Sequence, residues 1–394
     1  MSSVLVVGGG IAGLQAADSL ARAGVEVILA EREDDLGGNL KSLGTIFGDG
    51  RQAAELIEMR ARAISSSAKV TICTGTEVVS LGGAYPRLKA SLKTPEGTRE
   101  VECRSLVLAT GFTPFNPAAM KHYAFGRHPD VITAVELSDK LKGDRLLRNS
   151  NGDEPGALVF IQCIGSRELR THTYCSAFCC MYAVHFALQV KARLPRCRVE
   201  VLYMDIRTPF CAELDYEAAR RKGIGFIRSK PAAVRAEREN GRLAVQYEDT
   251  LDGGLRFLTA DMVVLSIGAE PPPDAASMAA SLQIATEESG FFAPEPAPVC
   301  TRAKGVFVAG AAGGPRGRAR AGIGHRQHRQ SVDRHGCDPG VYHLLRRQRP
   351  RQLRLDRRRA AGEVRRAADG QIVAAAAEGL AAQHAIGHGR QVEV

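Results

Sequence analysis

The stretch VLVVGGGIAGLQAADSLARAGVEVILAEREDDLGG, residues 4–38, decides how the chain begins to fold. Its apolar run over 4–7 predicts a buried strand, and the residues after the glycines predict a helix that ends near residue 23. A second apolar run over 25–30 predicts another strand, which ends at Glu31. This order of strand, glycine turn, helix and strand is typical of a βαβ unit with parallel strands.

Three glycines in this stretch have separate physical roles. Gly8, Gly10 and Gly13 fit the pattern G-x-G-x-x-G, in which the first makes a tight turn, the second admits a pyrophosphate and the third lets the helix pack on the strand. The helix N-terminus offers free amides to the phosphates, and Glu31 is placed to accept hydrogen bonds from a ribose. A glycine turn without a ligand is the alternative. Because the pattern follows a strand, opens a helix and meets an acidic residue, we expect a bound dinucleotide.

Three further stretches favour FAD over NAD as this dinucleotide. REDDLGGNL puts Gly37 and Gly38 shortly after the acidic residue, SLVLATGFTP (105–114) ends a strand in Ala-Thr-Gly, and KGVFVAGAAGGP (304–315) has the form of a closing strand. These features resemble the FAD domains of two-dinucleotide-binding-fold flavoproteins, and the resemblance implies that the glycine pair meets the flavin diphosphate. The residues expected to contact FAD are Gly8, Gly10, Ile11, Ala12, Gly13, Glu31, Arg32, Gly38, Asn39, Val78, Ala109, Thr110, Gly111, Gly310 and Ala311.

A second βαβ frame lacks the glycine pattern. PGALVFIQCIGSRE predicts a strand over 157–162, AFCCMYAVHFALQVKARLP (177–195) predicts a helix, and RVEVLYMDIRT (198–208) predicts the next strand. Cys163 stands where the first glycine of a nucleotide-binding turn is expected. Without the glycines the backbone cannot easily approach a pyrophosphate. The loop therefore holds something else.

Four cysteines mark this loop: Cys163, Cys175, Cys179 and Cys180. If the helix begins early enough, Cys175 and Cys179 share one of its faces, and Cys180 points about 100° round from Cys179. Four converging thiolates suit a [4Fe-4S] cluster or tetrahedral zinc, and the spacing C-x11-C-x3-C-C does not decide between them. A flavin in the same chain favours iron–sulfur, since zinc has no redox chemistry.

The stretches FIQCIGSR, YCSAFCCMYA and VLYMDIRT resemble the A subunit of heterodisulfide reductases. The resemblance implies that Cys163, Cys175, Cys179 and Cys180 hold a [4Fe-4S] cluster beside FAD. The C-x2-C-x2-C run of ferredoxin modules is absent from the sequence, so the chain is most similar to the short A subunits of sulfur-oxidising bacteria, or to the flavoprotein of quinone-interacting complexes. The family's expected partners are the other subunits of such a complex and a second copy of the chain.

The expected fold class is α/β, a Rossmann-type two-dinucleotide-binding-domain flavoprotein. Residues 1–115 are expected to begin the FAD domain, 116–255 to form an inserted second βαβ domain with the iron–sulfur site, and 256–314 to close the FAD domain. Residues 315–394 are expected to form a basic tail. Its composition sets it apart, with 17 Arg, no Lys and 7 acidic residues that account for the whole net charge of +10.

Three interpretations of the tail compete. A disordered basic segment could bind nucleic acid, and a solvated extension could bind nothing. We favour an out-of-frame translation of a GC-rich gene, because arginine without lysine is typical of such misreading, and we expect no nucleic-acid partner. The first residues lack the basic region of a signal peptide, and no apolar run reaches the roughly 18 residues that span a membrane. We therefore expect a cytoplasmic protein without direct membrane insertion, whose ten cysteines are thiols or metal ligands.

Two functions remain open, and the first of them is what the family resemblance implies. The first is an electron-transfer flavoprotein subunit of a heterodisulfide reductase-like complex, which passes electrons between FAD and a [4Fe-4S] cluster in sulfur-compound oxidation. The second is a stand-alone FAD- and NAD(P)H-dependent disulfide oxidoreductase that uses the cysteines as thiols. No nucleophile–base pair stands out, so no catalytic residue is assigned. The electron donor, the acceptor and the direction of flow are also left open.

Overall fold

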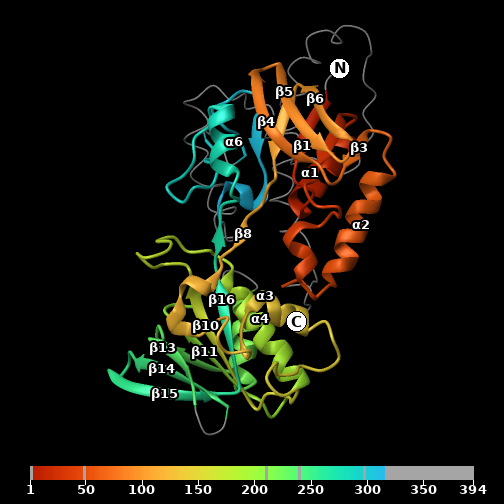
Figure 1. Cartoon of the computed structure of the whole chain (residues 1–394). Helices are drawn as coiled ribbons and strands as arrows, with labels where there is room; N and C mark the ends of the chain where they lie inside the picture. Colours follow the sequence, from red (N-terminus) through yellow and green to blue (C-terminus); the bar gives the residue numbers. More distant parts are fainter. Residues whose placement is uncertain (1–2, 48–49, 209–211, 238–240, 296–298, 316–394) are drawn as a thin grey trace, which may run out of the picture.

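The computed structural model describes residues 3–315 except for 48–49, 209–211, 238–240 and 296–298 (Figure 1). The basic tail predicted from residue 315 onward therefore lies outside the described residues except for Pro315 itself.

The first sheet is parallel and has the strand order β18-β7-β1-β2-β3. Its strands are β1 (Ser3–Val7), β2 (Glu26–Ala30), β3 (Val70–Cys73), β7 (Ser105–Leu108) and β18 (Val306–Val308). Helices α1 (Ile11–Arg22) and α2 (Ala53–Ser65) follow β1 and β2. β1 and β7 are central and almost wholly apolar, as a parallel strand covered on both faces requires. An antiparallel meander of β4 (Glu77–Ala84), β5 (Arg87–Thr94) and β6 (Gly97–Cys103) precedes β7.

The second sheet is also parallel and has the order β12-β11-β10-β16-β9. Its strands are β9 (Val131–Thr133), β10 (Ala157–Ile164), β11 (Arg198–Tyr203), β12 (Gly225–Arg228) and β16 (Met262–Ile267). Its helices are α3 (Ala134–Lys140), α4 (Cys179–Arg193) and α5 (Ala212–Arg221). A second antiparallel meander of β13 (Ala233–Ala236), β14 (Leu243–Asp249) and β15 (Gly254–Ala260) precedes β16.

The two units repeat one plan. In each, strand, helix, strand, helix and strand are followed by a meander and then by a strand that pairs beside the first one. The expected α/β, Rossmann-type fold with two dinucleotide-binding-type units is therefore confirmed. The second unit extends beyond residue 255, where we expected the chain to return to the first unit, because β15 and β16 complete the second meander and sheet. In the sequence, β16 is an apolar run that would fit the interior of either sheet.

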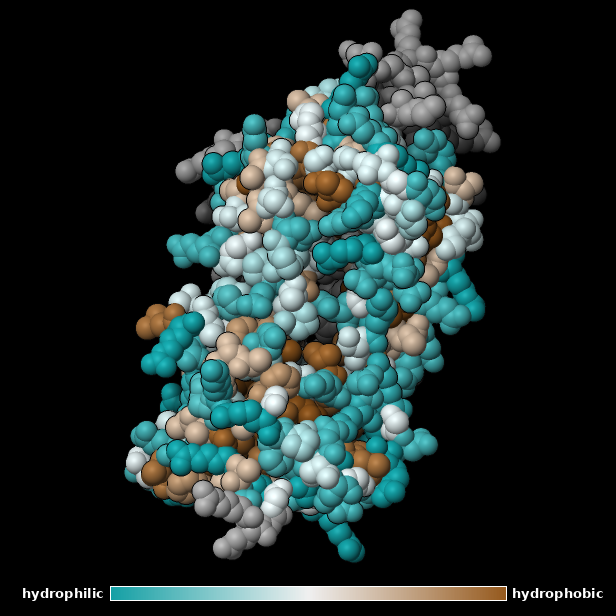
Figure 2. Space-filling model, viewed as in Figure 1, coloured by the Kyte–Doolittle hydropathy of each residue, from teal (hydrophilic) through white to brown (hydrophobic). Residues whose placement is uncertain are grey.

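Two short antiparallel strands carry the chain between the units. β8 (Thr113–Pro114) leads out of the first unit and β17 (Ala269–Glu270) leads back, and Figure 1 shows this pair between the upper and lower units. The return segment includes α6 (Ala275–Leu282) and ends in β18 and the short helix η4 (Gly310–Gly313). Hydrophilic residues cover most of the face shown in Figure 2, and hydrophobic ones gather mainly over the lower unit. Among the helices described, none has both the length and the apolar character that a membrane crossing needs.

Candidate functional site

The glycine turn after β1 combines two packed glycines with one open glycine. A Cβ on Gly8, whose φ is +107°, would lie 2.5 Å from the carbonyl oxygen of Ala109. A Cβ on Gly13 would lie 1.8 Å from the carbonyl oxygen of Gly8. At Gly10, by contrast, nothing in the described structure lies within 4 Å of an added Cβ. The turn is therefore held tight on two sides and bare at the position where a pyrophosphate is expected.

The N-terminus of α1 and Glu31 complete this turn. Gly10 caps α1 without a side-chain hydrogen bond, so the amides of the first turn stay available to an anion. The Glu31 carboxylate is 7% exposed and accepts hydrogen bonds from the amides of Gly9 and Glu33. Glu31 thus fixes the turn as well as standing where a ribose is expected. Arg32, the next residue, is largely exposed and lies 4.0 Å from the Asp274 carboxylate.

Several of the other residues expected to contact FAD lie at the turn, and the rest lie elsewhere in the first unit. Gly38 lies beside Gly10, since a Cβ on it would be 3.1 Å from the Gly10 Cα. Gly310, in η4, faces Ala12 of α1, and Ala311 follows it in the same short helix. Ala109, Thr110 and Gly111 follow β7, and the side-chain amide of Asn39 donates a hydrogen bond to the carbonyl oxygen of Phe112 at 2.7 Å. Ile11 begins α1, and Val78 in β4 packs against the core of the first unit.

Thr110 adds an observation that favours a bound group. Its hydroxyl is buried and has no hydrogen-bond partner among the residues described. Gly111, next in the chain, has a φ of +70° and open space on its Cβ side. An unpaired buried hydroxyl beside an open backbone is unfavourable unless a ligand satisfies it. The residues present therefore fit an FAD at the carboxyl edge of the first sheet.

The corresponding turn of the second unit is much longer. Residues 165–178 separate β10 from α4, whereas only residues 8–10 separate β1 from α1. Ser166 and Ser176 fasten the long loop, with 2.5 Å between their buried hydroxyl oxygens, and the amide of Ala269 donates to Ser176 at 3.1 Å. A Cβ on Gly268 would meet both hydroxyls. Protein side chains therefore fill the place where a glycine turn would admit a pyrophosphate.

Three of the four predicted cysteine ligands are in contact with one another. Cys163, the last but one residue of β10, has a φ of +60°, and its thiol is hydrogen-bonded to that of Cys179, which in turn meets Cys180. Cys180 also contacts the carbonyl oxygen of Asp205, with 3.7 Å between the sulfur and the oxygen. These thiols come from β10 and from the first turn of α4, which the parallel sheet brings together at its carboxyl edge.

Cys175 lies apart from these three. α4 begins at Cys179, so Cys175 is in the loop and does not share a helical face with Cys179, as an earlier helix start would have required. Its sulfur accepts from the amide of Ala177 at 3.3 Å and contacts the guanidinium of Arg207. No set of three or more Cys, His, Asp or Glu side chains in the described ranges has metal-holding geometry, and all the cysteines described there are free thiols.

Contacts among the thiols change their acidity. The hydrogen bond from Cys179 lowers the pKa of Cys163 to about 7, against the effect of burial and with help from Arg167. The same contact with Cys163, together with Cys180 and burial, raises the pKa of the Cys179 thiol. The pKa of Cys180 is lowered by the hydrogen bond from Cys179, which outweighs burial. These contacts therefore make Cys163 and Cys180 more acidic than ordinary cysteines and Cys179 less acidic.

Asp205 and two arginines border the thiols. Burial would raise the pKa of Asp205, but hydrogen bonds from Arg207 and Arg167 lower it. Asp205 follows β11 much as Glu31 follows β2, so it occupies the place of the ribose-binding acid in the second unit. Because two guanidinium groups engage this carboxylate, it is poorly placed to bind a ribose. Sequence reasoning missed Asp205, although its position at the end of the second strand was a usable signal.

The Ala-Thr-Gly turn after β7 and the cysteine loop meet at the junction of the two units. Phe112, directly after the Ala-Thr-Gly turn, packs against Phe178, directly before Cys179, with 5.3 Å between ring centroids and an interplanar angle of 37°. His172 in the loop lies 2.8 Å from the Glu270 carboxylate, and the Tyr174 hydroxyl donates to the carbonyl of Ala269 at 2.8 Å. The loop is thus fixed to β17, and the two candidate sites adjoin.

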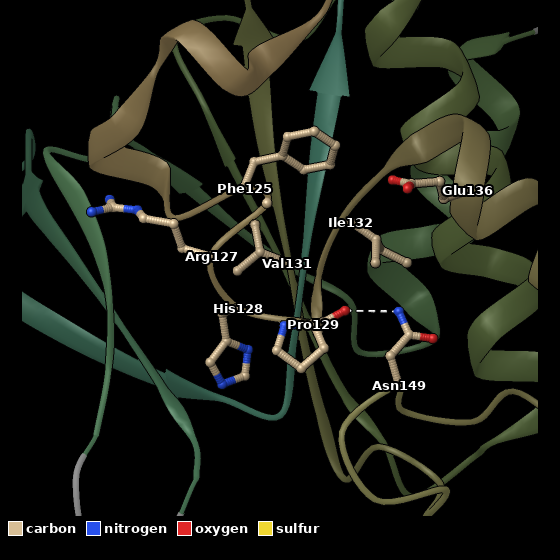
Figure 3. Close-up of a pocket in the computed structure, with 9 residues that line it drawn as sticks. Phe125, Arg127, His128, Pro129, Val131, Ile132, Glu136 and Asn149 are labelled. Atoms are coloured by element: carbon tan, nitrogen blue, oxygen red, sulfur yellow. Dashed lines mark hydrogen bonds between the residues drawn. The ribbon is translucent and has the colours of Figure 1, made fainter.

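A cavity of about 350 Å³ lies elsewhere in the second unit, at the edge strand β9. Figure 3 shows Phe125, Val131 and Ile132 along it and Asn149, whose side-chain amide donates to the Pro129 carbonyl at 2.7 Å. A second hollow of about 630 Å³ lies beside β3. The described linings of both lack the four loop cysteines and the glycine turn, so neither belongs to the candidate site.

The comparisons with known proteins agree with this geometry. Residues 2–148 match the family model described as pyridine nucleotide-disulphide oxidoreductase. The Thermoplasma acidophilum thioredoxin reductase structure superposes with a TM-score of 0.55 at 16% identity, over 80% of this chain and 92% of that one, which shows a common fold.

Two curated relatives match a larger part of the chain than the family model does. The chain is 28% identical to the A subunit of the ferredoxin/F(420)H(2)-dependent CoB-CoM heterodisulfide reductase of Methanosarcina acetivorans, over 80% of this chain and 50% of that protein. It is also 28% identical to the iron-sulfur A subunit of the CoB–CoM heterodisulfide reductase of Methanocaldococcus jannaschii, over 80% of this chain and 61% of that protein. The chain thus spans about half to three fifths of their length. These findings confirm the expected relationship, since the chain is homologous to the A subunits of heterodisulfide reductases over four fifths of its length, and they support an FAD-dependent oxidoreductase.

Proposed function

We propose that the chain is the electron-transfer flavoprotein subunit of a heterodisulfide reductase-like complex, with FAD in the first unit and a [4Fe-4S] cluster in the second. Cys163, Cys175, Cys179 and Cys180 would hold the cluster. When bound, FAD exchanges electrons in pairs and the cluster exchanges them singly, so the two groups together couple a two-electron carrier to one-electron carriers.

The observation that carries this proposal is that the second unit has a long loop bordered by thiols where the first unit has its short glycine turn. In the second unit, residues 165–178 stand where the first unit has its glycine turn, and Cys163, Cys179 and Cys180 gather at the end of β10 and the start of α4. The contact between Phe112 and Phe178 puts this loop directly against the FAD turn. A short distance between the two groups is what electron transfer within one polypeptide requires.

The charges around the thiols support an anionic inorganic centre. Four thiolates bound to an iron–sulfur core carry net negative charge, which needs compensation in a partly buried site. Arg167 lies beside Cys163 and Arg207 lies beside Cys175. Contact with Cys175 and Asp205 raises the pKa of Arg207 even though burial acts the other way. A site of neutral packed thiols would not need these two cations.

The name of one relative also supports the proposal. The Methanocaldococcus jannaschii homologue is named as an iron-sulfur protein of its reductase. Since this chain covers only part of that protein, the cluster, the partner subunits and the reaction come to this chain as proposals. We infer a setting in cytoplasmic oxidation of sulfur compounds, with a homodimer of this chain among the subunits. As an alternative, the same site would suit the flavoprotein subunit of a quinone-interacting oxidoreductase complex.

Oxygen-free purification tests the proposal. We expect about four iron and four sulfide per FAD, and a paramagnetic signal after reduction. Replacement of Cys179 by Ser is expected to remove the iron while FAD stays bound, because Cys179 lies in the second unit. Protein with full flavin and neither iron nor a reducible paramagnetic centre would refute the assignment.

The alternative is a stand-alone NAD(P)H-dependent disulfide oxidoreductase. It would need a nucleotide to enter the second unit, where the Ser166–Ser176 pair fills the turn and Asp205 is engaged by Arg167 and Arg207. Rapid reduction of the flavin by NADH or NADPH in iron-free protein would favour it. Slow or absent reduction by both is the outcome we expect.

The basic tail does not enter the proposed function. We propose that residues from 315 onward are an out-of-frame translation, because 17 arginines and no lysine occur there. The relatives match 80% of the chain, which is the share that residues 1–315 make up. Resequencing the gene around codon 315 tests this directly: a second frame that encodes a small-residue helix supports it, and an unchanged reading refutes it.

A further inference from the structure

The second antiparallel meander has exposed apolar side chains along its last strand, β15. Leu255 and Phe257 are 62% and 60% exposed, and Leu251, in the turn between β14 and β15, is 85% exposed. Leu258 and Ala260 lie on the opposite face of β15 and pack in the core of the second unit. One face of this strand is therefore a core face, and the other presents large apolar side chains to the solvent, which is typical of an interaction surface.

The backbone of β15 is also open on one side. In the described sheets β15 pairs with β14 alone, and Figure 1 shows β15 at the outer border of the lower unit. Gln246 of β14 lies opposite Phe257, and its carbonyl accepts from the Ala232 amide at 2.8 Å, on the side away from β15. Gln246 and Phe257 therefore do not exchange hydrogen bonds, and the N–H and C=O of Phe257 point to the free side. Those of Leu255, two residues earlier, point there as well.

β15 lacks the protection that is usual for an exposed edge. Natural edge strands are blunted by Lys, by Pro or by a bulge. The sequence GLRFLTA contains neither residue, and its register with β14 is regular throughout. The charge of Arg256 is engaged by the carboxylates of Asp249 and Asp252. The strand can therefore accept a neighbour through both its backbone and its apolar side chains.

The charges at the two ends of β15 favour a second copy of the chain as that neighbour. At the last residues of the strand, the exposed Arg198 guanidinium donates to the Thr259 carbonyl. At the first residues, the turn carries Asp249 and the half-exposed Asp252. When two identical strands pair antiparallel, the basic end of each lies beside the acidic end of the other. The same pairing places Leu255 of one copy opposite Phe257 of the second copy, which is a favourable cross-strand contact.

We propose that β15 is the interface of a homodimer, in which the β15 strands of two copies pair antiparallel about a two-fold axis. The two meanders then form one continuous sheet. Such an interface is isologous, so each favourable contact occurs twice. This inference deepens the proposed function, because it names the surface of the homodimer included there, and it depends on neither FAD nor the cysteines. The contact is one short strand pair with its apolar side chains, so the dimer is reversible rather than obligate.

Sedimentation velocity of the full chain tests the interface. We expect the wild type to change from monomer to dimer between about 2 µM and about 200 µM. Leu255→Lys and Phe257→Lys are each expected to raise the dissociation constant about a hundredfold, since each substitution occurs twice in the dimer. Both side chains are exposed, so the flavin-to-protein ratio should stay at its wild-type value. Met59→Lys is the matched control, because Met59 is 49% exposed on α2 of the first unit, and it should leave the dissociation constant unchanged.

A mixing experiment tests the antiparallel arrangement. Arg198→Asp alone brings acidic ends together, and Asp252→Arg alone brings basic ends together, so each variant is expected to dimerise about tenfold more weakly than the wild type. In the mixture, one copy of each variant restores both oppositely charged contacts, and heterodimers should form with wild-type affinity. Within one copy the two residues lie at opposite ends of β15, about 20 Å apart, so this recovery requires two copies.

Each outcome decides the inference. A wild type that stays monomeric at about 200 µM would overturn it, as would a dimer that persists unchanged in both lysine variants, because its interface would lie elsewhere. Hydrogen exchange at the Leu255 and Phe257 amides should slow as the protein concentration rises. Slow exchange that is independent of concentration would mean that another segment of the same chain covers β15, and would overturn the inference. Flavin, iron and sulfide contents are measured separately, so these outcomes leave the proposed electron-transfer role standing.

Discussion

Ser176→Ala tests how the cysteine loop is held. Ser176 is fully buried; its hydroxyl lies 2.5 Å from that of Ser166 and accepts from the Ala269 amide at 3.1 Å. The substitution leaves two buried groups unpaired, the Ser166 hydroxyl and the Ala269 amide. At roughly 1.5 kcal/mol each, the loop loses about 3 kcal/mol against local opening, or roughly a hundredfold in the opening equilibrium.

Hydrogen exchange followed by mass spectrometry measures this change. Peptides that contain the Ala269 amide and the loop 165–178 are expected to exchange roughly a hundredfold faster in the variant, while peptides from the first sheet keep their rates. Ser277→Ala is the control, since the Ser277 hydroxyl is exposed on α6 and donates only to the Asp274 carbonyl. Exchange rates within about threefold of the wild type in both peptides would refute the reasoning, because they would mean that the buried pair does not restrain the loop.

Three further predictions concern other parts of the chain. Gly13→Ala is expected to lower the flavin-to-protein absorbance ratio roughly tenfold, because its Cβ would meet the Gly8 backbone oxygen, whereas Gly82→Ala, with open space, should leave the ratio unchanged. Asp130→Asn is expected to lower the free energy of unfolding by about 2 kcal/mol near neutral pH. Burial raises the pKa of Asp130, but hydrogen bonds, first those from Ser150, outweigh burial and hold this pKa below its ordinary value of 3.8. The urea midpoints of variant and wild type should therefore converge as the pH falls below 3.8. Deletion of 316–394 is expected to leave the flavin-to-protein ratio as it is, and a drop would show that the tail contributes to the FAD site.

The local features of the site can be predicted from the sequence, and the long-range ones cannot. The glycine turn is visible in the sequence because its glycines lie within six residues of one another and Gly13 meets the Gly8 backbone, although Gly8 itself packs against Ala109, which is distant in the chain. The absence of that turn before Cys163 is equally visible in the sequence. The start of α4 is not, because residues 175–178 have no strong helix-breaking signal and are held as a loop by contacts with β17. For that reason the sequence leaves open whether the helix begins early enough to include Cys175, and in the structure it does not.

The serine pair and Asp205 show the same limit. Ser166 and Ser176 matter because Gly268 leaves room for them, and Gly268 is about a hundred residues away in the chain. Arg207 is two residues from Asp205 in the chain, but Arg167 becomes its neighbour only when β10 and β11 align in the sheet. Such contacts depend on tertiary packing, which short-range patterns do not encode. The predicted boundary at residue 255 differs from the structure for a related reason, since the sequence of an apolar strand such as β16 does not show which sheet the strand joins.

On the proposed function, the repeat of one plan in the two units would let a cluster take the place of a nucleotide with little change of fold. In the first unit the N-terminus of α1 faces the place of a phosphate, and in the second the N-terminus of α4 carries Cys179 and Cys180. Both positions lie at the positive end of a helix and at the carboxyl edge of a parallel sheet, where a negative group is stabilised. Thiolates bound to an iron–sulfur core need the same compensation as a pyrophosphate, and Arg167 and Arg207 extend it beyond the helix. The second unit therefore keeps the electrostatics of a dinucleotide site, and its longer loop changes which anion the site suits.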